Sequence, residues 1–127
     1  AAVCAPPGKL KGVVLVEHRD EVFDRLAADL ASIPLRIARA LNASVASRRF
    51  ARNPSDLMIA NVDLPDESGW LLACKTRLVF PTARIWLYTA HPSALDRARA
   101  RYLGVARLIH YGGDLLRLGG KVLKRLA

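Results

Sequence analysis

One stretch in the middle of the chain decides the fold class, and it reads Leu57-Met58-Ile59-Ala60-Asn61-Val62-Asp63-Leu64-Pro65-Asp66-Glu67-Ser68-Gly69. Its first four residues are apolar, which is typical of a short strand that is buried on both faces. The proline, acidic residues and glycine that follow indicate a turn. After the turn, apolar side chains recur at helical spacing up to Pro81, and we expect four of them to face the core: Trp70, Leu71, Cys74 and Leu78.

The same pairing of a strand with a helix recurs on both sides of this stretch. Short apolar runs predict further strands at residues 13–16, 35–41, 85–88 and 108–109. We expect three helices to begin at side chains that can cap them, Asp20, Asn42 and Asp114, and a further helix to start at Ser93. Five such units, at roughly 22 to 25 residues each, predict an α/β fold with a doubly wound, five-stranded parallel sheet.

The composition suits one folded domain and excludes several other classes. The 127 residues have a mass of 13.9 kDa, a mean hydropathy of +0.15 and 52% hydrophobic side chains, which excludes intrinsic disorder as the main state. The two cysteines, Cys4 and Cys74, are too few for a disulfide framework or a zinc site, so we expect a cytoplasmic location. The apolar runs are shorter than the roughly 20 residues of a membrane span. We expect residues 1–11 to be a flexible segment and residues 12–127 to form the domain.

The net charge of +9 is unevenly distributed along the chain. Residues 1–63 carry nine basic and seven acidic side chains, whereas residues 64–127 carry eleven basic and four acidic ones. The C-terminal half therefore attracts anionic partners, such as nucleic acid or an acidic protein surface. Much of the excess lies on the last two predicted helices, at Arg97, Arg101, Arg117, Lys121, Lys124 and Arg125.

Polar side chains follow several strands of the predicted sheet. In a sheet of this kind, ligands bind beyond the carboxyl ends of the strands. Glu17 and His18 come after the first strand, Asn61 after the third, Thr89 after the fourth and Tyr111 after the fifth. We therefore expect a candidate site at this edge of the sheet.

The stretch from Pro54 to Gly69 resembles the third strand and following turn of bacterial response-regulator receiver domains. The resemblance covers roughly residues 12–126, and it extends to the Thr89-Ala90 pair after the fourth strand and to Gly104-Val105 before the fifth. It implies a CheY-like, flavodoxin-like fold with the strand order 2-1-3-4-5. It also implies a role in bacterial two-component signalling or a phosphorelay.

At the phosphorylation site, this sequence departs from the pattern of the family it resembles. Receivers place an aspartate at the end of the third strand, four residues before the proline and eight before the glycine, and that position is Asn61 here. The two acidic residues that hold Mg²⁺ correspond to Glu17 and His18. The lysine after the fifth strand corresponds to Tyr111, and the aromatic residue near the switch threonine corresponds to Leu108. The threonine after the fourth strand matches the family.

These departures remove the chemistry that the resemblance would otherwise imply. An amide does not form a stable acyl phosphate, since phosphoryl transfer here needs a carboxylate nucleophile and a cation that neutralises charge. A hard octahedral ion prefers oxygen ligands, and here it would meet an imidazole at His18 and an uncharged amide at Asn61. We therefore expect a degenerate receiver, or pseudo-receiver, that is not an enzyme and has no metal or cofactor.

Two other functional assignments remain open from the sequence: a different phosphoryl acceptor and an anion pocket lined by histidines. Asp63 lies two residues beyond Asn61 and would point to the same side if the third strand continued, which would make it the phosphoryl acceptor of an active receiver. His18, His91 and His110 all lie near strand ends, and the first two would line a small anion pocket with the threonine after the fourth strand. They lack a cluster of cysteines or carboxylates at metal-ligand spacing.

The resemblance and the charge pattern indicate the same interaction face. In receivers, the surface of the fourth helix, fifth strand and fifth helix is a common site for dimers or effector proteins, and here it would comprise Arg97, Arg101, Leu108, Arg117, Lys121 and Lys124. Our leading hypothesis is a non-phosphorylatable signalling or scaffold module that binds a protein partner or a second copy through this face. The alternative is a module that binds nucleic acid through its basic half.

Overall fold

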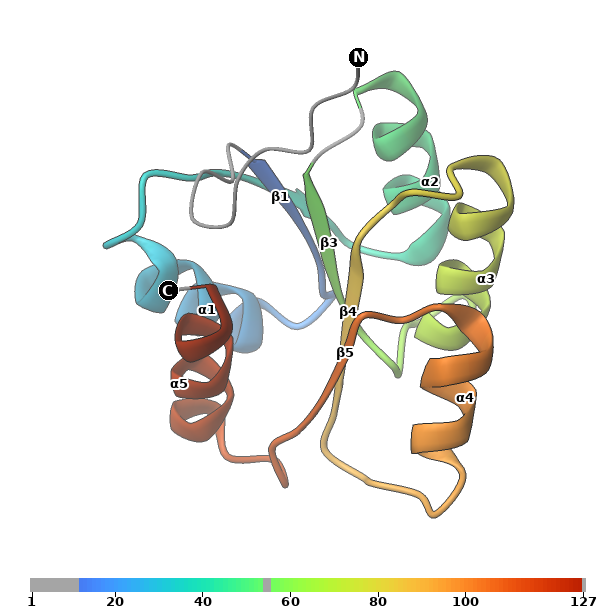
Figure 1. Ribbon diagram of the computed structural model, residues 1–127. Coiled ribbons are helices and arrows are strands. Elements are labelled where there is room, and N and C mark those ends of the chain that lie inside the picture. Colours follow the sequence, from blue (N-terminus) through green and yellow to red (C-terminus); the bar gives the residue numbers. More distant parts are fainter. Residues whose placement is uncertain (1–11, 54–55, 127) are drawn as a thin grey trace.

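A parallel sheet of five strands forms the centre of the molecule in a computed structural model that describes residues 12–53 and 56–126 (Figure 1). The strand order is β2-β1-β3-β4-β5, which confirms the predicted fold class and strand order. The segment expected to be flexible, residues 1–11 with Cys4, lies outside the described residues. The strands are β1 (Gly12–Val16), β2 (Arg36–Ala40), β3 (Leu57–Asn61), β4 (Ile85–Thr89) and β5 (Arg107–His110).

Helices cover both faces of the sheet, so that β1, β3 and β4 are almost entirely buried (Figure 1). One core lies under α1 (Asp20–Leu30) and α5 (Leu115–Leu126). The other lies under α2 (Ala43–Arg52), α3 (Gly69–Val79) and α4 (Asp96–Leu103). Alternate residues of each strand enter opposite cores, as the period of two in a strand requires. No helix in the described part of the chain combines the length and apolar character that crossing a bilayer requires.

Two of the three predicted helix caps are confirmed. The Asn42 side chain accepts the backbone N–H of Val45 at 2.8 Å and caps α2. The Asp114 carboxylate accepts the N–H of Leu116 at 3.1 Å, immediately before α5. Gly104 ends α4 with a positive φ of 70°, a left-handed conformation that favours glycine.

The predicted cap at Asp20 and the predicted start of a helix at Ser93 are wrong. Asp20 is the first residue of α1, and it pairs with Arg39 across a distance of 2.9 Å, so Arg19 takes the cap position without a side-chain bond. Ser93 lies before the start of α4, and its N–H donates to the carboxylate of Asp96 at 2.7 Å. The Asp20 carboxylate is thus engaged by a guanidinium rather than by a helix N–H. The Ser93 hydroxyl accepts the N–H of Leu95 at 3.3 Å, in the turn that precedes α4.

The predicted inward face of α3 is also wrong. Leu71 and Leu78 are 44% and 77% exposed, and Cys74 is only partly buried. The buried face instead comprises Gly69, Leu72, Ala73 and Thr76. Gly69 sets this rotation, because a Cβ at that position would collide with the backbone carbonyl oxygen of Asn61. The helix therefore begins with its glycine against the end of β3, and the residues three, four and seven positions later face the sheet.

A second close approach joins α1 to α5. A Cβ on Gly119 would overlap the carboxylate of Asp29, which is itself paired with Arg25 at 3.3 Å. The neighbouring Gly120 faces open space, with nothing within 4 Å of an added Cβ. The two adjacent glycines of α5 therefore have different roles, and Gly119 is the one that permits α5 to pack against α1.

We expect Gly119→Ala to lower the free energy of unfolding by about 1–2 kcal/mol relative to Gly120→Ala, although both changes raise helix propensity. The added methyl group at position 119 must displace Asp29 from its pair with Arg25. Urea unfolding of both variants measures the difference, and Gly119→Ala in an Asp29→Ala background serves as the control. Equal stability of the two single variants would show that the close contact has no energetic role.

Candidate functional site

A buried carboxylate, that of Glu17, lies at the carboxyl end of β1. The Glu17 side chain is 0% exposed, and both of its oxygens accept hydrogen bonds. Oε1 accepts from the Asn61 amide at 2.8 Å and from the Tyr88 hydroxyl at 2.7 Å. Oε2 accepts from the backbone N–H of Arg19 at 3.0 Å and from its Nε at 3.4 Å. We call these four residues the Glu17 network.

The parallel sheet brings the members of the Glu17 network together. The ends of β1, β3 and β4 are adjacent, and the register places Asn61 opposite Tyr88. Arg39 from β2 holds the turn after β1, because its guanidinium donates to the carbonyls of Glu17 and His18 at 3.2 and 3.3 Å. The carboxylate is therefore fixed from the strands on both sides of β1.

The donors of the Glu17 network keep the buried carboxylate ionised. Burial raises the pKa of Glu17, but hydrogen bonds from the Arg19 backbone N–H, Tyr88, Asn61 and the Arg19 guanidinium outweigh it and lower the pKa. Burial and the Glu17 charge raise the pKa of Tyr88 well above its usual value, so the hydroxyl stays a donor. Burial lowers the pKa of Arg19, but Tyr111 and Glu17 outweigh it and raise the pKa above its usual value. The site is a neutralised ion pair with two neutral donors.

The structure brings together most of the residues that the sequence predicts for the site. His18 Nδ1 lies 3.5 Å from Glu17 Oε2, and the His18 side chain is 44% exposed. The buried Tyr111 joins through its hydroxyl, which accepts from Arg19 at 3.4 Å. Thr89 is buried, but its hydroxyl bonds to the backbone N–H and carbonyl of His91 at 3.1 and 3.3 Å. Thr89 therefore stabilises its own turn and makes no hydrogen bond to the Glu17 network.

Sequence reasoning missed two members of the network, Arg19 and Tyr88. Tyr88 was interpreted as a sheet residue, and its ring does pack in the core, 5.9 Å from the ring of Tyr111. Its hydroxyl nevertheless reaches Glu17 across the sheet. A signal was present, since a tyrosine in a buried strand needs a hydrogen-bond partner, and Glu17 is the carboxylate at the end of a strand.

Asp63 lies outside this arrangement. Strand β3 ends at Asn61, and Asp63 lies in the following turn with an exposed side chain. Its backbone N–H donates to Asn61 Oδ1 at 2.9 Å. Both polar atoms of the asparagine amide thus make a hydrogen bond, the nitrogen to Glu17 and the oxygen to the turn.

The remaining titratable groups do not form a metal site. Among residues 12–53 and 56–126, no three His, Cys, Asp or Glu side chains are grouped so that they could hold a metal ion. His110 lies elsewhere, with Nε2 3.1 Å from the buried carboxylate of Asp96. The Glu17 carboxylate would have to lose present donors before it bound a cation.

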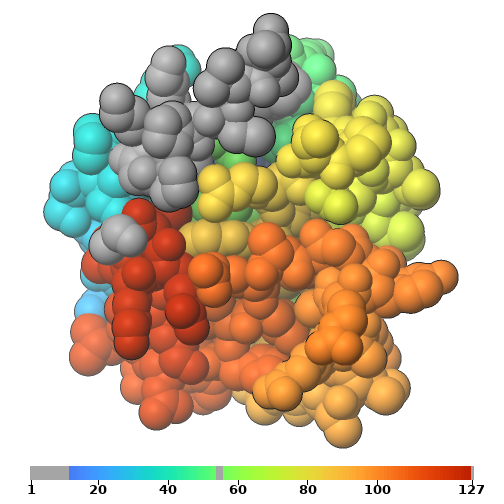
Figure 2. Space-filling view, in the orientation of Figure 1, coloured from blue at the N-terminus to red at the C-terminus, as the bar shows by residue number. Residues whose placement is uncertain are grey.

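The predicted interaction face lies on the side of the molecule formed by α4, β5 and α5, which are coloured orange to red in the lower half of Figure 2. A basic groove of about 360 Å³ runs between β5 and α5, and its lining includes Leu108, Lys121 and Lys124 together with Arg107 and Arg125. The other predicted members, Arg97, Arg101 and Arg117, are exposed and do not line this groove.

An apolar groove of about 790 Å³ lies between α3 and α4, beside the predicted face. Its lining includes Trp70, Leu95 and Tyr102, and the last two are 59% and 90% exposed. Trp70 packs partly against the core, as predicted, but it also lines this groove, which sequence reasoning missed.

Solved structures show what this architecture resembles. The signal receiver domain of a putative LuxO repressor protein from Vibrio parahaemolyticus has a TM-score of 0.80 at 20% identity, and the match covers 92% of this chain and 90% of that one. The signal receiver domain of an HD domain-containing protein from Pseudomonas fluorescens has a TM-score of 0.78 at 24% identity, covering 93% and 95%. The chain has the receiver-domain fold. No family model and no curated protein matches the sequence.

The receiver fold also occurs in a protein that was solved with bound Mg²⁺ and BeF. The response regulator TrrA from Thermotoga maritima, in complex with Mg²⁺ and BeF, has a TM-score of 0.76 at 23% identity, and the match covers 92% of this chain and all of that one (100%). In the present chain, the carboxyl end of β3 in the receiver fold carries an asparagine hydrogen-bonded to a buried glutamate.

We expect Glu17→Gln to lower the free energy of unfolding by about 2–4 kcal/mol near neutral pH, because the amide loses charge-assisted bonds and turns an NH₂ group toward donors. The lowered pKa of Glu17 sets the pH dependence. The wild-type advantage is present above the usual value of 4.5 and is lost as the pH falls through the lower folded-state pKa. Urea unfolding of the wild type and of Glu17→Gln, from neutral to acidic pH, measures this difference in stability.

Glu21→Gln is the control for this experiment. Glu21 is an exposed glutamate in the first turn of α1, so its replacement should change stability by less than about 1 kcal/mol. A gap between wild type and Glu17→Gln that stays constant down to strongly acidic pH would contradict an ionised Glu17.

Proposed function

We propose that this chain is a non-phosphorylatable, receiver-like signalling or scaffold module that acts by binding another protein. The observation that carries the proposal is the hydrogen bond of 2.8 Å from the Asn61 amide to the buried Glu17 carboxylate. In the receivers that the sequence resembles, an aspartate at the position of Asn61 accepts the phosphoryl group. Here that position holds a neutral group that donates to a neighbouring acid.

Three features of the site support the absence of phosphoryl transfer. A carboxamide offers no anionic oxygen as a nucleophile. The Arg19 guanidinium lies 3.4 Å from Glu17 Oε2 and supplies the positive charge that a bound cation would otherwise supply. Tyr111 takes the position of the family's lysine, and its hydroxyl is occupied by Arg19 at 3.4 Å. No step that needs a metal ion or a catalytic acid is assigned to this module.

The charge on the α4–β5–α5 face favours an acidic partner over a second copy of the chain. Lys121, Lys124, Arg107 and Arg125 gather around one groove. A symmetric dimer through this face would place the same basic patch on itself, and juxtaposed like charges oppose association. An acidic surface on a cytoplasmic signalling protein would be steered toward the groove.

We expect the melting temperature of the wild-type chain to stay unchanged in Mg²⁺ and beryllofluoride, and acetyl phosphate to leave no phosphoryl group on it. Asn61→Asp should lose about 2–3 kcal/mol of stability, because two carboxylates would then face each other where the amide now donates. Millimolar Mg²⁺ should restore part of that loss by binding between them. Thermal unfolding and mass spectrometry measure these effects.

Asp63→Asn is the matched control for the phosphorylation test, since it removes an acid two residues away in the exposed turn. Asp63→Asn should have the same melting temperature response to Mg²⁺ and beryllofluoride as the wild type, and it should likewise carry no phosphoryl group. Stoichiometric, acid-labile phosphate on the wild-type chain would refute the proposal, and its loss in Asp63→Asn would assign the acceptor to Asp63.

A nucleic-acid-binding module is the second candidate, and the basic groove beside β5 is the observation that favours it. On the leading proposal, we expect the chain to be monomeric at low salt in sedimentation experiments and to bind an oligonucleotide only weakly at about 150 mM salt. Fluorescence anisotropy measures the binding. Tight binding with a steep salt dependence that Lys121→Gln/Lys124→Gln abolishes would favour the nucleic-acid candidate instead.

A further inference from the structure

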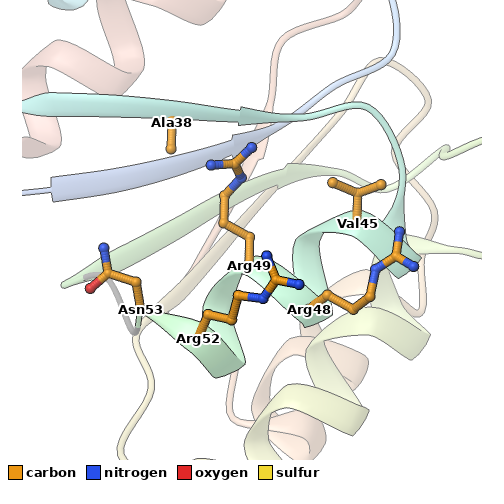
Figure 3. A pocket seen from close by; sticks show the side chains of 6 residues that line it. All are labelled: Ala38, Val45, Arg48, Arg49, Arg52 and Asn53. Atoms are coloured by element: carbon orange, nitrogen blue, oxygen red, sulfur yellow. The ribbon is translucent and has the colours of Figure 1, made fainter.

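We propose that a second pocket, between α2 and the edge strand β2, binds a small organic polyphosphate such as a nucleoside di- or triphosphate. This inference does not rest on the proposed signalling function. The pocket has a volume of about 390 Å³ and is lined by Ala38, Val45, Arg48, Arg49, Arg52 and Asn53. Figure 3 shows the Arg49 side chain extending from α2 toward Ala38 on β2.

The three arginines of this pocket carry uncompensated charge. α2 contains no acidic residue, and within the described ranges no ion pair or hydrogen bond reaches the side chains of Arg48, Arg49 or Arg52. Elsewhere in the same half of the chain, Arg25 pairs with Asp29 and Arg39 with Asp20. Three guanidinium groups around one concave surface create a positive potential that a multiply charged anion would neutralise.

Helix stability accounts for only part of this arrangement. Arg49 and Arg52 lie in the last turn of α2, where a basic side chain interacts favourably with the helix dipole. Arg48 and Arg52 are four residues apart on one helix face, and like charges at that spacing oppose helix formation. Arg48 therefore adds repulsion between positive charges at the pocket. A bound anion would attract all three guanidinium groups and offset that repulsion.

The size and lining of the pocket define the class of ligand. About 390 Å³ lies within the range of small-molecule sites. Each guanidinium can hold a phosphate through two parallel hydrogen bonds, so three of them match a ligand with two or three phosphates. Ala38 and Val45 are short apolar side chains that leave a surface for an organic group, and the Asn53 amide offers both a donor and an acceptor.

The pocket is separate from the Glu17 network. α2 begins after the carboxyl end of β2 and runs back for 10 residues, which is about 15 Å of helix. The three arginines lie on the second half of α2, toward the amino ends of the strands. A ligand held there would leave Glu17 and Asn61 untouched, so the two sites can be tested independently.

Calorimetric titration of the full chain with ATP and with inorganic tripolyphosphate, without Mg²⁺ and at about 150 mM salt, tests the proposal. We expect both to bind, ATP the more tightly of the two. Arg49→Gln/Arg52→Gln should weaken ATP binding by at least about tenfold, since two of the three guanidinium groups are lost. Lys75→Gln/Arg84→Gln removes the same charge at exposed positions outside the pocket and should change the affinity by less than about twofold.

Three results of these titrations would overturn the proposal. Absence of ATP binding, or equal weakening by the two double variants, would reduce the pocket to general surface charge. A single-stranded oligonucleotide that binds far more tightly than ATP, and loses that affinity in Arg49→Gln/Arg52→Gln, would assign the same arginines to nucleic acid. Circular dichroism of both double variants shows whether they fold, and the phosphorylation experiments above are unaffected by either result.

Discussion

The carboxyl edge of the sheet depends on one requirement, which is that the carboxylate of Glu17 stay ionised in a site without exposure to water. An isolated carboxylate in such a place would take up a proton, because desolvation disfavours its charged form. Four hydrogen bonds from Arg19, Asn61 and Tyr88 prevent this. The same bonds tie the ends of β1, β3 and β4 to the turn that follows β1. A change at any donor leaves a buried acceptor without its partner, which costs more than the bond itself contributes.

This requirement also explains why the side chains at the edge belong together. Asn61 places a neutral donor beside Glu17, and Arg19 supplies the compensating positive charge. Tyr88 and Tyr111 fill the adjoining space with rings that pack edge to face, 5.9 Å apart, while their hydroxyls serve the ion pair. A site for a phosphoryl group and a divalent cation needs several acidic oxygens facing an open pocket. The arrangement here satisfies its one buried acid from within the protein.

Much of the fold could be predicted from the sequence, because buried parallel strands and amphipathic helices leave strong periodic signals. The alternation of strands and helices and the caps at Asn42 and Asp114 follow from local patterns, whereas the strand order was implied by the resemblance to receiver domains. The face of α3 did not, because its rotation is set by the contact between Gly69 and the carbonyl of Asn61, which only the packed structure reveals. In the site, Glu17 and Asn61 were predicted from their places after strands, since such ends meet at one edge. Tyr88 was missed because its role depends on the reach of a hydroxyl across the sheet.

α2 connects the Glu17 edge with the pocket between α2 and β2, because hydrogen bonds hold its N-terminus at that edge. The Asp66 carboxylate, in the loop after β3, accepts the N–H groups of Ala43 and Ser44 at 2.9 Å each. Slight burial raises the pKa of Asp66, but these backbone donors outweigh it and lower the pKa. The N-terminus of α2 is thereby bound to the loop that follows Asn61. α2 therefore contacts this loop with its first residues and lines the pocket beside β2 with its second half, so one rigid helix joins the two places in the fold.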